Sequence, residues 1–233
     1  MVVAGDSTAC TMIPGLTAVA PSYGFQVQNA SVVGCGIVSD RIAPDVIDSQ
    51  DIFDFTKICY DETLTQESQA LRRGAPKIVV WDSIWERESL AVDHNGVVSV
   101  LRVGTPAWRS ELLRRMDGRL RMFSSTGAVT VVLLQPSFAR PSHAGPVTPD
   151  DLTFQTLNSV LRSFASQHPG QVALVDLAPR ICPSGPPCPY RVDGFVPRPD
   201  SAHYSGATAL WLARWLVPQI VSAAATLQHP QQK

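Results

Sequence analysis

The sequence predicts one α/β domain, a three-layer α/β/α sandwich around a five-stranded parallel sheet. Short runs rich in Val, Leu and Ile alternate along the chain with longer segments of helical composition. The clearest run, residues 128–134, is apolar at nearly every position, as expected for a parallel strand covered on both faces. The segments between the runs are long enough to be crossover helices. Neither an internal repeat nor a Gly/Ser-rich linker divides the sequence.

The expected strands follow from these apolar runs. The first run stops at Gly5, a short run that begins at Lys77 stops at Trp81, and the strongest run stops before Gln135. Each run is therefore followed by a residue that suits a turn or a polar edge. The strands are expected at residues 2–4, 25–33, 77–81, 128–134 and 171–177.

The expected helices carry start and stop signals. Pro106 lies near the start of one helix, and Asp150 and Asp151 lie near the positive end of another. Gly74 and Pro76 end a polar helix. Residues 34–60 hold no clean period, and residues 178–204 form a Pro-rich loop. The helices are expected at residues 8–20, 62–73, 106–123, 149–167 and 205–225.

We expect a single domain over residues 1–225, followed by a disordered tail at residues 226–233. The first strand is short, because only four residues precede Gly5. A central strand is not expected to begin at an initiator Met. We therefore expect this chain to be a domain of a longer protein, or to have its true start upstream.

Composition and charge narrow the function classes. The chain has 233 residues, 45% of them hydrophobic, which suits one large globular domain. Nineteen Lys and Arg against 20 Asp and Glu leave a net charge of −1, which argues against a nucleic-acid partner. The most apolar stretch, residues 207–225, contains Arg214 and Pro218, so we expect a buried or half-buried helix rather than a membrane span. The start of the chain has no signal-peptide pattern, and the chain is expected to be soluble as written.

The five cysteines offer two candidate disulfides. Cys182 and Cys188 flank a Pro-stiffened loop that could close a small ring, and Cys35 and Cys59 form a second candidate pair. Five cysteines allow other pairings, and Cys10 is expected to be a buried helix residue. Two disulfides favour an oxidising compartment. The cysteines and histidines lack metal-ligand spacing, so we expect neither a metal nor another cofactor.

Three polar residues suit serine-dependent acyl transfer, which needs a nucleophile, a histidine base and an acid that orients the base. Ser7 follows the first strand and opens a helix, so its hydroxyl lies at the sheet edge and its N–H faces outward. Asp200 precedes His203 by three residues, just before the last helix. Gly34 follows the second strand and could present an N–H to an oxyanion, with Gly36 as the alternative. Each residue could also have a purely structural role: Ser7 as a helix cap, His203 as a surface histidine and Gly34 as a turn glycine.

These blocks resemble the SGNH (GDSL-like) hydrolase family. The segment from Gly5 to Ser7 resembles the first block, residues 29–34 resemble the second, and Asp200 with His203 resembles the last. The match runs the length of the chain in the right order. The resemblance implies the flavodoxin-like SGNH fold, Ser7, Asp200 and His203 as catalytic residues, and the Ser7 and Gly34 N–H groups as oxyanion donors.

One block departs from the family pattern, because no Asn follows the strand that ends at Trp81. Ser83 or the Trp85 indole could replace the donor that the Asn supplies. With Trp108 downstream, this variant resembles the SGNH domains of actinobacterial acyltransferase-3 (OafA-type) membrane proteins. That resemblance implies an acyltransferase-3 membrane domain as partner, a place outside the cytoplasmic membrane, and an acylated glycan or glycolipid as substrate.

Two further alternatives concern surface chemistry. Trp81, Ser83 and Trp85 are candidate substrate-lining residues. Trp81, Trp85 and Trp108 are interpreted as core residues, with a sugar site as the alternative, because aromatic rings near a strand end can pack on sugar C–H surfaces. An arginine run on the helix at residues 106–123 suits a solvated face, or contact with anionic lipid or a membrane domain. As a rival to catalysis, the domain could bind a glycan or present an acceptor to a membrane acyltransferase.

Overall fold

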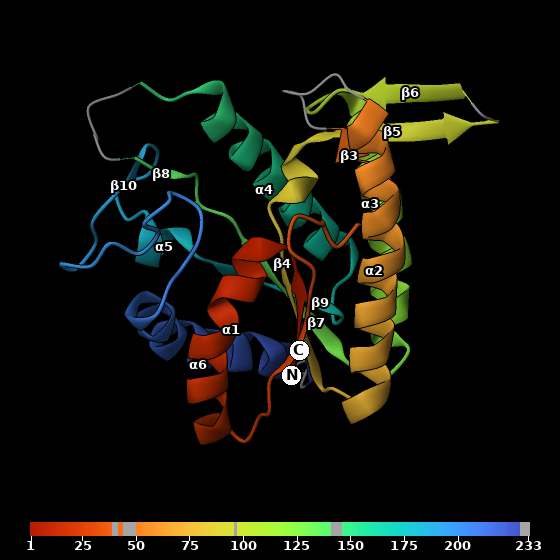
Figure 1. The fold of residues 1–233 in the computed structure, drawn as a ribbon. Coiled ribbons are helices and arrows are strands. Elements are labelled where there is room, and N and C mark those ends of the chain that lie inside the picture. The colour runs from red at the N-terminus through yellow and green to blue at the C-terminus, as the bar shows by residue number, and fades with distance from the viewer. Residues whose placement is uncertain (39–41, 44–49, 96, 141–145, 229–233) are drawn as a thin grey trace.

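A computed structural model describes residues 1–38, 42–43, 50–95, 97–140 and 146–228 (Figure 1). Its central sheet has five parallel strands in the order β2-β1-β4-β7-β9. In this sheet Ala4 pairs with Ala30 on one side and with Trp81 on the other. The predicted architecture is confirmed. The strands are β1 (Val2–Gly5), β2 (Gln28–Ser31), β4 (Ile78–Asp82), β7 (Val129–Leu134) and β9 (Val172–Asp176).

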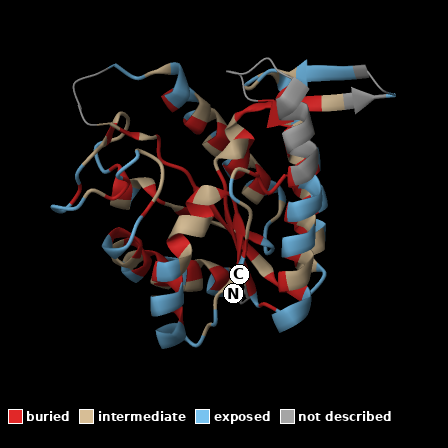
Figure 2. Cartoon of the chain, viewed as in Figure 1, coloured by how far each residue is buried: buried red, intermediate tan, exposed pale blue. Residues whose placement is uncertain are grey.

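Helices cover both faces of the sheet, so the strands are buried between two cores (Figure 2). Val3 packs in the core beneath the helices at residues 7–19 and 207–228, and Trp81 packs in the core beneath the helices at residues 50–74, 106–124 and 149–167. Alternate strand residues face opposite sides, which is why one apolar run serves both cores. One layer holds α1 (Ser7–Val19) and α6 (Ala207–Gln228), and the other holds α2 (Gln50–Gly74), α3 (Pro106–Ser124) and α4 (Pro149–Gln167).

The α1 and α6 helices cross in close contact. A Cβ atom added to Gly15 would lie 2.1 Å from the backbone oxygen of Ala209, so only glycine allows this approach. Among the described residues, α6 is also the one helix whose length and hydropathy would allow it to cross a membrane. Leu212, Leu216 and Ile220 on α6 are nevertheless buried in the core with α1. Packing inside the domain thus accounts for much of the apolar character of α6.

Several boundaries differ from the expectation. The α2 helix begins at Gln50 rather than at residue 62, because the preceding residues lack a clear cap and period and the tertiary context sets the start. The expected strand at residues 25–33 is reduced to β2. The last helix continues to Gln228, beyond the expected end at residue 225, and residues 229–233 lie outside the described part of the chain.

The structure also contains small elements that the apolar pattern did not predict. The antiparallel sheet β3-β5-β6 lies outside the central sheet. Its exposed Val98 and Val100 give no core signal that could have revealed it. The elements are η1 (Ala20–Tyr23), β3 (Ile42–Ala43), η2 (Trp85–Arg87), β5 (Ser89–His94), β6 (Val97–Leu101), β8 (Ala139–Arg140), α5 (Ala178–Ile181) and β10 (Cys188–Pro189).

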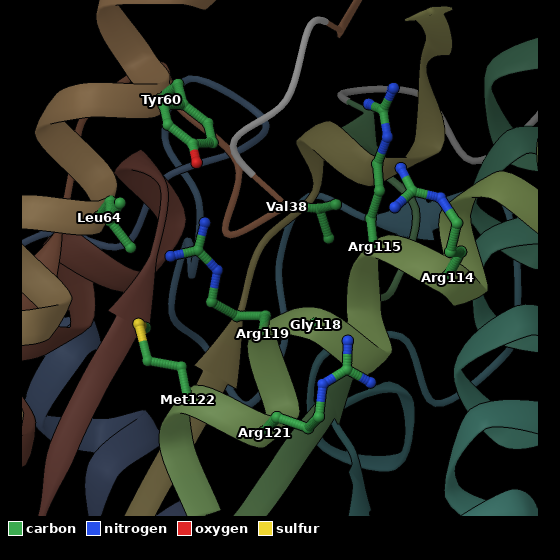
Figure 3. A pocket seen from close by; sticks show the side chains of 9 residues that line it. All are labelled: Val38, Tyr60, Leu64, Arg114, Arg115, Gly118, Arg119, Arg121 and Met122. Atoms are coloured by element: carbon green, nitrogen blue, oxygen red, sulfur yellow. The ribbon is translucent and has the colours of Figure 1, made fainter. Parts of the chain in front are cut away.

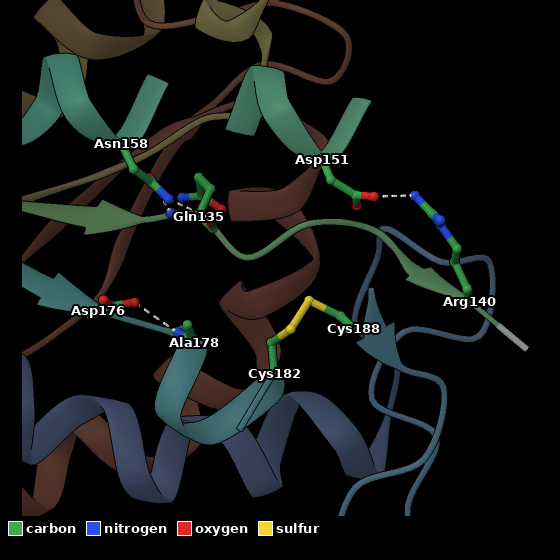
Figure 4. The surroundings of a disulfide bond; sticks show 8 residues. All are labelled: Gln135, Arg140, Asp151, Asn158, Asp176, Ala178, Cys182 and Cys188. Carbon is green, nitrogen blue, oxygen red and sulfur yellow. Dashed lines mark hydrogen bonds and ion pairs between the residues drawn. A yellow bond between two sulfur atoms is a disulfide. The ribbon is translucent and has the colours of Figure 1, made fainter. Parts of the chain in front are cut away.

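Both candidate cysteine pairs are disulfide-bonded in the structure. Cys35 bonds Cys59 and thereby ties the loop after β2 to α2. Cys182 bonds Cys188 and ties the end of α5 to β10 (Figure 4). Cys10 on α1 is free and partly exposed. The second disulfide therefore stiffens the start of the loop that leads to His203.

Candidate active site

The candidate residues meet at the carboxyl ends of the central strands, where ligands bind in open parallel sheets. Ser7 is the first residue of α1 and follows β1 after one intervening residue. Gly34 lies three residues after β2, and His203 lies four residues before α6. The fold thus brings together residues from the two ends of the chain.

Ser7, His203 and Asp200 form one continuous hydrogen-bonded row. His203 Nε2 lies 2.7 Å from Ser7 Oγ. His203 Nδ1 lies 2.6 Å from Asp200 Oδ2. A carboxylate on Nδ1 favours the tautomer that carries its proton there, which leaves Nε2 free to accept the serine proton. This is the geometry of a nucleophile, a base and an orienting acid.

The Asp200 carboxylate is organised by its own loop. Asp200 Oδ1 accepts hydrogen bonds from the His203 N–H at 2.8 Å and the Ala202 N–H at 3.1 Å. Ser201 supplies the turn, with a φ of 79°. Partial burial acts to raise the pKa of Asp200, but the hydrogen bonds from His203 and Ala202 lower it to about 2. The carboxylate is therefore ionised at neutral pH and can stabilise an imidazolium.

Asp6, which precedes Ser7, is buried and joins the Ser7 turn to the loop after β4. Its Oδ1 accepts bonds from the Thr8 N–H and the Thr8 hydroxyl at 2.8 and 2.7 Å. Its Oδ2 accepts the Ile84 N–H at 2.7 Å, the Ser83 hydroxyl at 3.0 Å and the Trp85 N–H at 3.3 Å. The Asp6 side chain thus caps α1 and fixes the position of the adjacent serine.

A second carboxyl group lies beside Asp6. Asp82, at the end of β4, is 1% exposed and accepts a bond from Gln135 Nε2 at 2.6 Å. Burial, together with the nearby charge of Asp6, raises the pKa of Asp82 to about 7. Sequence reasoning did not single out Asp82 or Gln135. Their position directly after predicted strands was the signal that could have found them.

Glu86 and Arg87, which are adjacent on η2, have separate partners. Glu86 is buried, burial raises its pKa, and its Oε1 accepts the Val38 N–H at 3.1 Å. Arg87 instead pairs with Glu88 at 2.6 Å and packs over the rings of two phenylalanines, Phe138 and Phe154. The charges separate because consecutive residues of η2 point to different sides.

Two backbone N–H groups suit an oxyanion. The Ser7 N–H belongs to the first turn of α1, where helix N–H groups have no acceptor within the helix. Gly34 is partly exposed and has a φ of 79°, which favours glycine at this turn. The alternative, Gly36, is buried, and a Cβ there would lie 3.0 Å from Glu86 Oε1. Gly34 is therefore the better placed of the two glycines.

The residues after β4 do not match the expectation of a substrate-lining surface. Trp81, in β4, is 1% exposed and packs edge-on against Phe123, so of its two interpretations the structure supports the core residue and not the sugar site. Ser83 is also buried, and its hydroxyl donates to Asp6. Trp85 is partly buried against the same core. The two tryptophans are therefore used in apolar packing, and the Ser83 hydroxyl is used in a hydrogen bond to the Asp6 carboxylate.

The arginine run on α3 is only partly solvated (Figure 3). Arg115 and Arg119 are buried. Glu111 accepts hydrogen bonds from Arg114 and Arg115, which lower the pKa of Glu111 to about 2, and the bond from Arg114 has the larger effect. Glu67 forms an ion pair with Arg119. The interpretation of the run as a solvated face therefore holds for Arg114 but not for Arg115 and Arg119. A pocket of about 260 Å³ lies between α2 and α3, and its basic lining residues are Arg114, Arg115, Arg119 and Arg121.

The described residues contain no group of three or more His, Cys, Asp or Glu side chains arranged to hold a metal ion. Around the serine lie the His203 imidazole, the carboxyl groups of Asp200, Asp6 and Asp82, and backbone N–H groups. This set can move a proton and form a covalent ester.

Comparisons with known proteins concern the fold and the family of the chain. No curated protein has a significant sequence match to the chain. Among solved structures, the periplasmic domain of a lipopolysaccharide acetyltransferase from Salmonella ser. Paratyphi A aligns with a TM-score of 0.60 and 12% identity, covering 94% of this chain and 83% of that chain. A GDSL-like lipase from Bacteroides thetaiotaomicron aligns with a TM-score of 0.55 and 10% identity, covering 96% and 87%. At such identities the likeness concerns the fold.

The sequence comparison with protein families is more specific. A model of the SGNH domain, described as fused to AT3 domains, matches residues 1–218 of this chain. The match includes the Ser7 turn, Gly34 and the loop that carries Asp200 and His203. The chain therefore belongs to the family of SGNH domains that are fused to AT3 domains.

Proposed function

We propose that this domain carries out serine-dependent acyl transfer on an ester, with Ser7 as nucleophile, His203 as base and Asp200 as the orienting acid. The observation that carries the proposal is the unbroken row Asp200–His203–Ser7, with separations of 2.6 and 2.7 Å. Both distances fall within hydrogen-bond reach, as proton transfer requires.

The proposed reaction has two halves. His203 Nε2 takes the proton of Ser7 Oγ while Oγ attacks the ester carbonyl, and the Ser7 and Gly34 N–H groups donate to the oxyanion. When the intermediate collapses, the alcohol leaves with the proton from His203 and the acyl group remains on Ser7. Water or a sugar hydroxyl then gives a proton to His203 and takes the acyl group, which frees Ser7. Water makes the domain an esterase, and a sugar hydroxyl makes it a transferase.

The proposed substrate is an O-acetyl or other small O-acyl ester on a cell-surface glycan or glycolipid. Membership of a family fused to AT3 domains supports a membrane acyltransferase domain as the partner. The likeness to the periplasmic domain of a lipopolysaccharide acetyltransferase supports the same substrate class. Two disulfides favour an oxidising compartment, so we place the domain on the extracytoplasmic side of the membrane.

A second candidate function is a glycan-binding or acceptor-presenting module with weak or no turnover. One observation favours it: the loop after β4 lacks an Asn, and the hydroxyl of Ser83 is already donated to Asp6. The oxyanion would then depend on the Ser7 and Gly34 N–H groups and on the Trp85 indole, the other candidate donor. Losing one oxyanion donor costs roughly 10²–10³ in rate in serine proteases, so a slow enzyme is compatible with this geometry.

The deciding experiment compares purified wild type with Ser7→Ala in hydrolysis of p-nitrophenyl acetate. We expect the variant to lose on the order of 10⁴–10⁶ in turnover. Ser166→Ala, an exposed serine on α4, is the matched control and should retain wild-type activity. A fluorophosphonate should add one adduct to wild type and to the control, but none to Ser7→Ala. Full activity in folded Ser7→Ala would refute the proposal, and folded wild type without activity or adduct would favour the binding module.

A further inference from the structure

A second hollow lies on the outer face of α6, beside α5 and the loop that contains Phe195. Its volume is about 520 Å³, within the range of about 300–1,000 Å³ typical of small-molecule sites. Its first residue on α6, Ala207, comes four residues after His203. The proposed reaction does not use this surface. The residues lining the groove are Arg180, Phe195, Ala207, Leu210, Trp211, Arg214 and Trp215.

Aromatic side chains form much of the groove. Trp211 and Trp215 are one helical turn apart on α6, so both indoles lie on the same face of the helix. The Phe195 ring lies 5.9 Å from that of Trp211 and is 39% exposed. Exposed ring faces can pack against the C–H surfaces of a sugar ring. Aromatic residues that line a hollow, instead of protruding from a flat surface, favour a discrete ligand over a lipid bilayer.

One cation of the groove is held in place before any ligand arrives. The Arg180 guanidinium carbon lies 4.0 Å from the centroid of the Trp211 ring, a cation–π contact. Arg180 Nη1 also donates to Asp193 Oδ2 at 2.8 Å. These two contacts restrict the side chain, which lowers the entropy cost of binding.

The second cation has no acidic partner. Arg214 is exposed on α6, and no ion pair joins it to the described part of the chain. Asp193 balances Arg180, so the groove carries an excess positive charge at Arg214. The pocket between α2 and α3 is different, because Glu111 and Glu67 already pair with three of its arginines.

We propose that this groove binds a glycan that carries acidic groups, with the sugar rings on Trp215, on Phe195 and on the part of Trp211 that Arg180 does not cover, and an acidic group near Arg214. The inference rests on the proposed function, since it assigns the groove to the acceptor or acylated glycan of that reaction. A neutral sugar would leave the charge of Arg214 unused. An acidic glycan uses both the ring faces and the cation.

The test is a titration of the domain with tetragalacturonate, followed by intrinsic tryptophan fluorescence and calorimetry, with maltotetraose as the neutral probe. We expect tetragalacturonate to bind at least ten times more tightly than maltotetraose, and added salt to reduce that preference. Trp211→Ala should weaken binding by at least tenfold. Arg214→Gln should weaken it about tenfold, while Arg214→Lys should keep most of the affinity. Tyr23→Ala, an exposed aromatic on η1 outside the groove, should bind like wild type.

Three outcomes would overturn the inference. Equal affinity for the two probes would refute the role of charge. Unchanged binding in Trp211→Ala would place the ligand elsewhere. Failure to bind either probe, with Trp211-dependent binding to phosphatidylglycerol vesicles, would identify a membrane contact instead. Ser7→Ala separates this inference from the proposed reaction, because it should lose ester hydrolysis and still bind tetragalacturonate.

Discussion

Replacing Asp82 with Asn should make the domain more stable than wild type at high pH. The Thr8 hydroxyl lies 2.7 Å from Asp6 Oδ1 and 3.3 Å from Asp82 Oδ2, and it has one proton to donate. The shorter bond to Asp6 takes that proton. Asp82 Oδ2 then faces the hydroxyl oxygen and is stabilised only when it carries a proton of its own. An Asn at this position supplies an N–H there and keeps an oxygen for Gln135.

The size of the effect follows from proton linkage. The pKa of Asp82 rises from 3.8 to about 7 in the folded protein because of burial and the Asp6 charge. Between these two values the folded state holds a proton that the unfolded state has released. The free energy of unfolding therefore falls as the pH rises, by about 1.4 kcal/mol per pH unit. Between pH 5 and pH 7 this amounts to about 2–3 kcal/mol, and Asp82→Asn removes it.

The assay is urea denaturation of wild type and Asp82→Asn at pH 5, 6, 7 and 8, analysed as the difference between the two proteins. Glu67, whose pKa burial also raises, is present in both proteins and cancels in that difference. The charge of Glu86 acts on Asp82 and is therefore part of the measured effect. The advantage of the variant should grow up to about pH 7 and then level off. Asp61→Asn, on the exposed side of α2, is the control and should show a constant difference. A constant difference for Asp82→Asn as well would refute the reasoning.

Two further predictions concern stability and can be checked by urea or thermal unfolding. Gly15→Ala should destabilise the domain by about 2 kcal/mol or more, because the new methyl group meets the backbone of α6. Gly118→Ala on α3 should stabilise it by up to about 1 kcal/mol, since the new methyl group would make only an ordinary contact with the Arg121 guanidinium at 3.8 Å. Equal effects of the two substitutions would contradict the tight helix crossing. Replacing both cysteines of the Cys35–Cys59 pair by Ser should cost about 3 kcal/mol, against about 2 kcal/mol for the Cys182–Cys188 pair, because the sequence separations are 24 and 6 residues. The reverse order would show that the loop-entropy account does not apply here.

The local sequence was sufficient for the parts of the site that depend on neighbouring residues. Ser7 begins a helix directly after a strand, and Asp200 reaches His203 across a three-residue gap. Strand and helix positions alone place such residues at one edge of a parallel sheet. The apolar runs likewise determined β1, β4 and β7, because a strand buried on both faces needs apolar side chains on both sides. The edge strand β2, which is polar and only partly buried, is shorter than its run predicted.

Only the tertiary structure decided which polar groups remain available for chemistry. Asp6 accepts bonds from residues 83–85, more than 70 positions away, and this contact uses the hydroxyl that had been a candidate oxyanion donor. Trp81 is a core residue because α3 covers it, which no local pattern reveals. The groove beside α6 needs Arg180 and Phe195 from separate segments. Burial and long-range pairing are properties of the folded chain. The type and spacing of a residue therefore show which chemistry it is capable of, and its neighbours in space decide whether that chemistry is available.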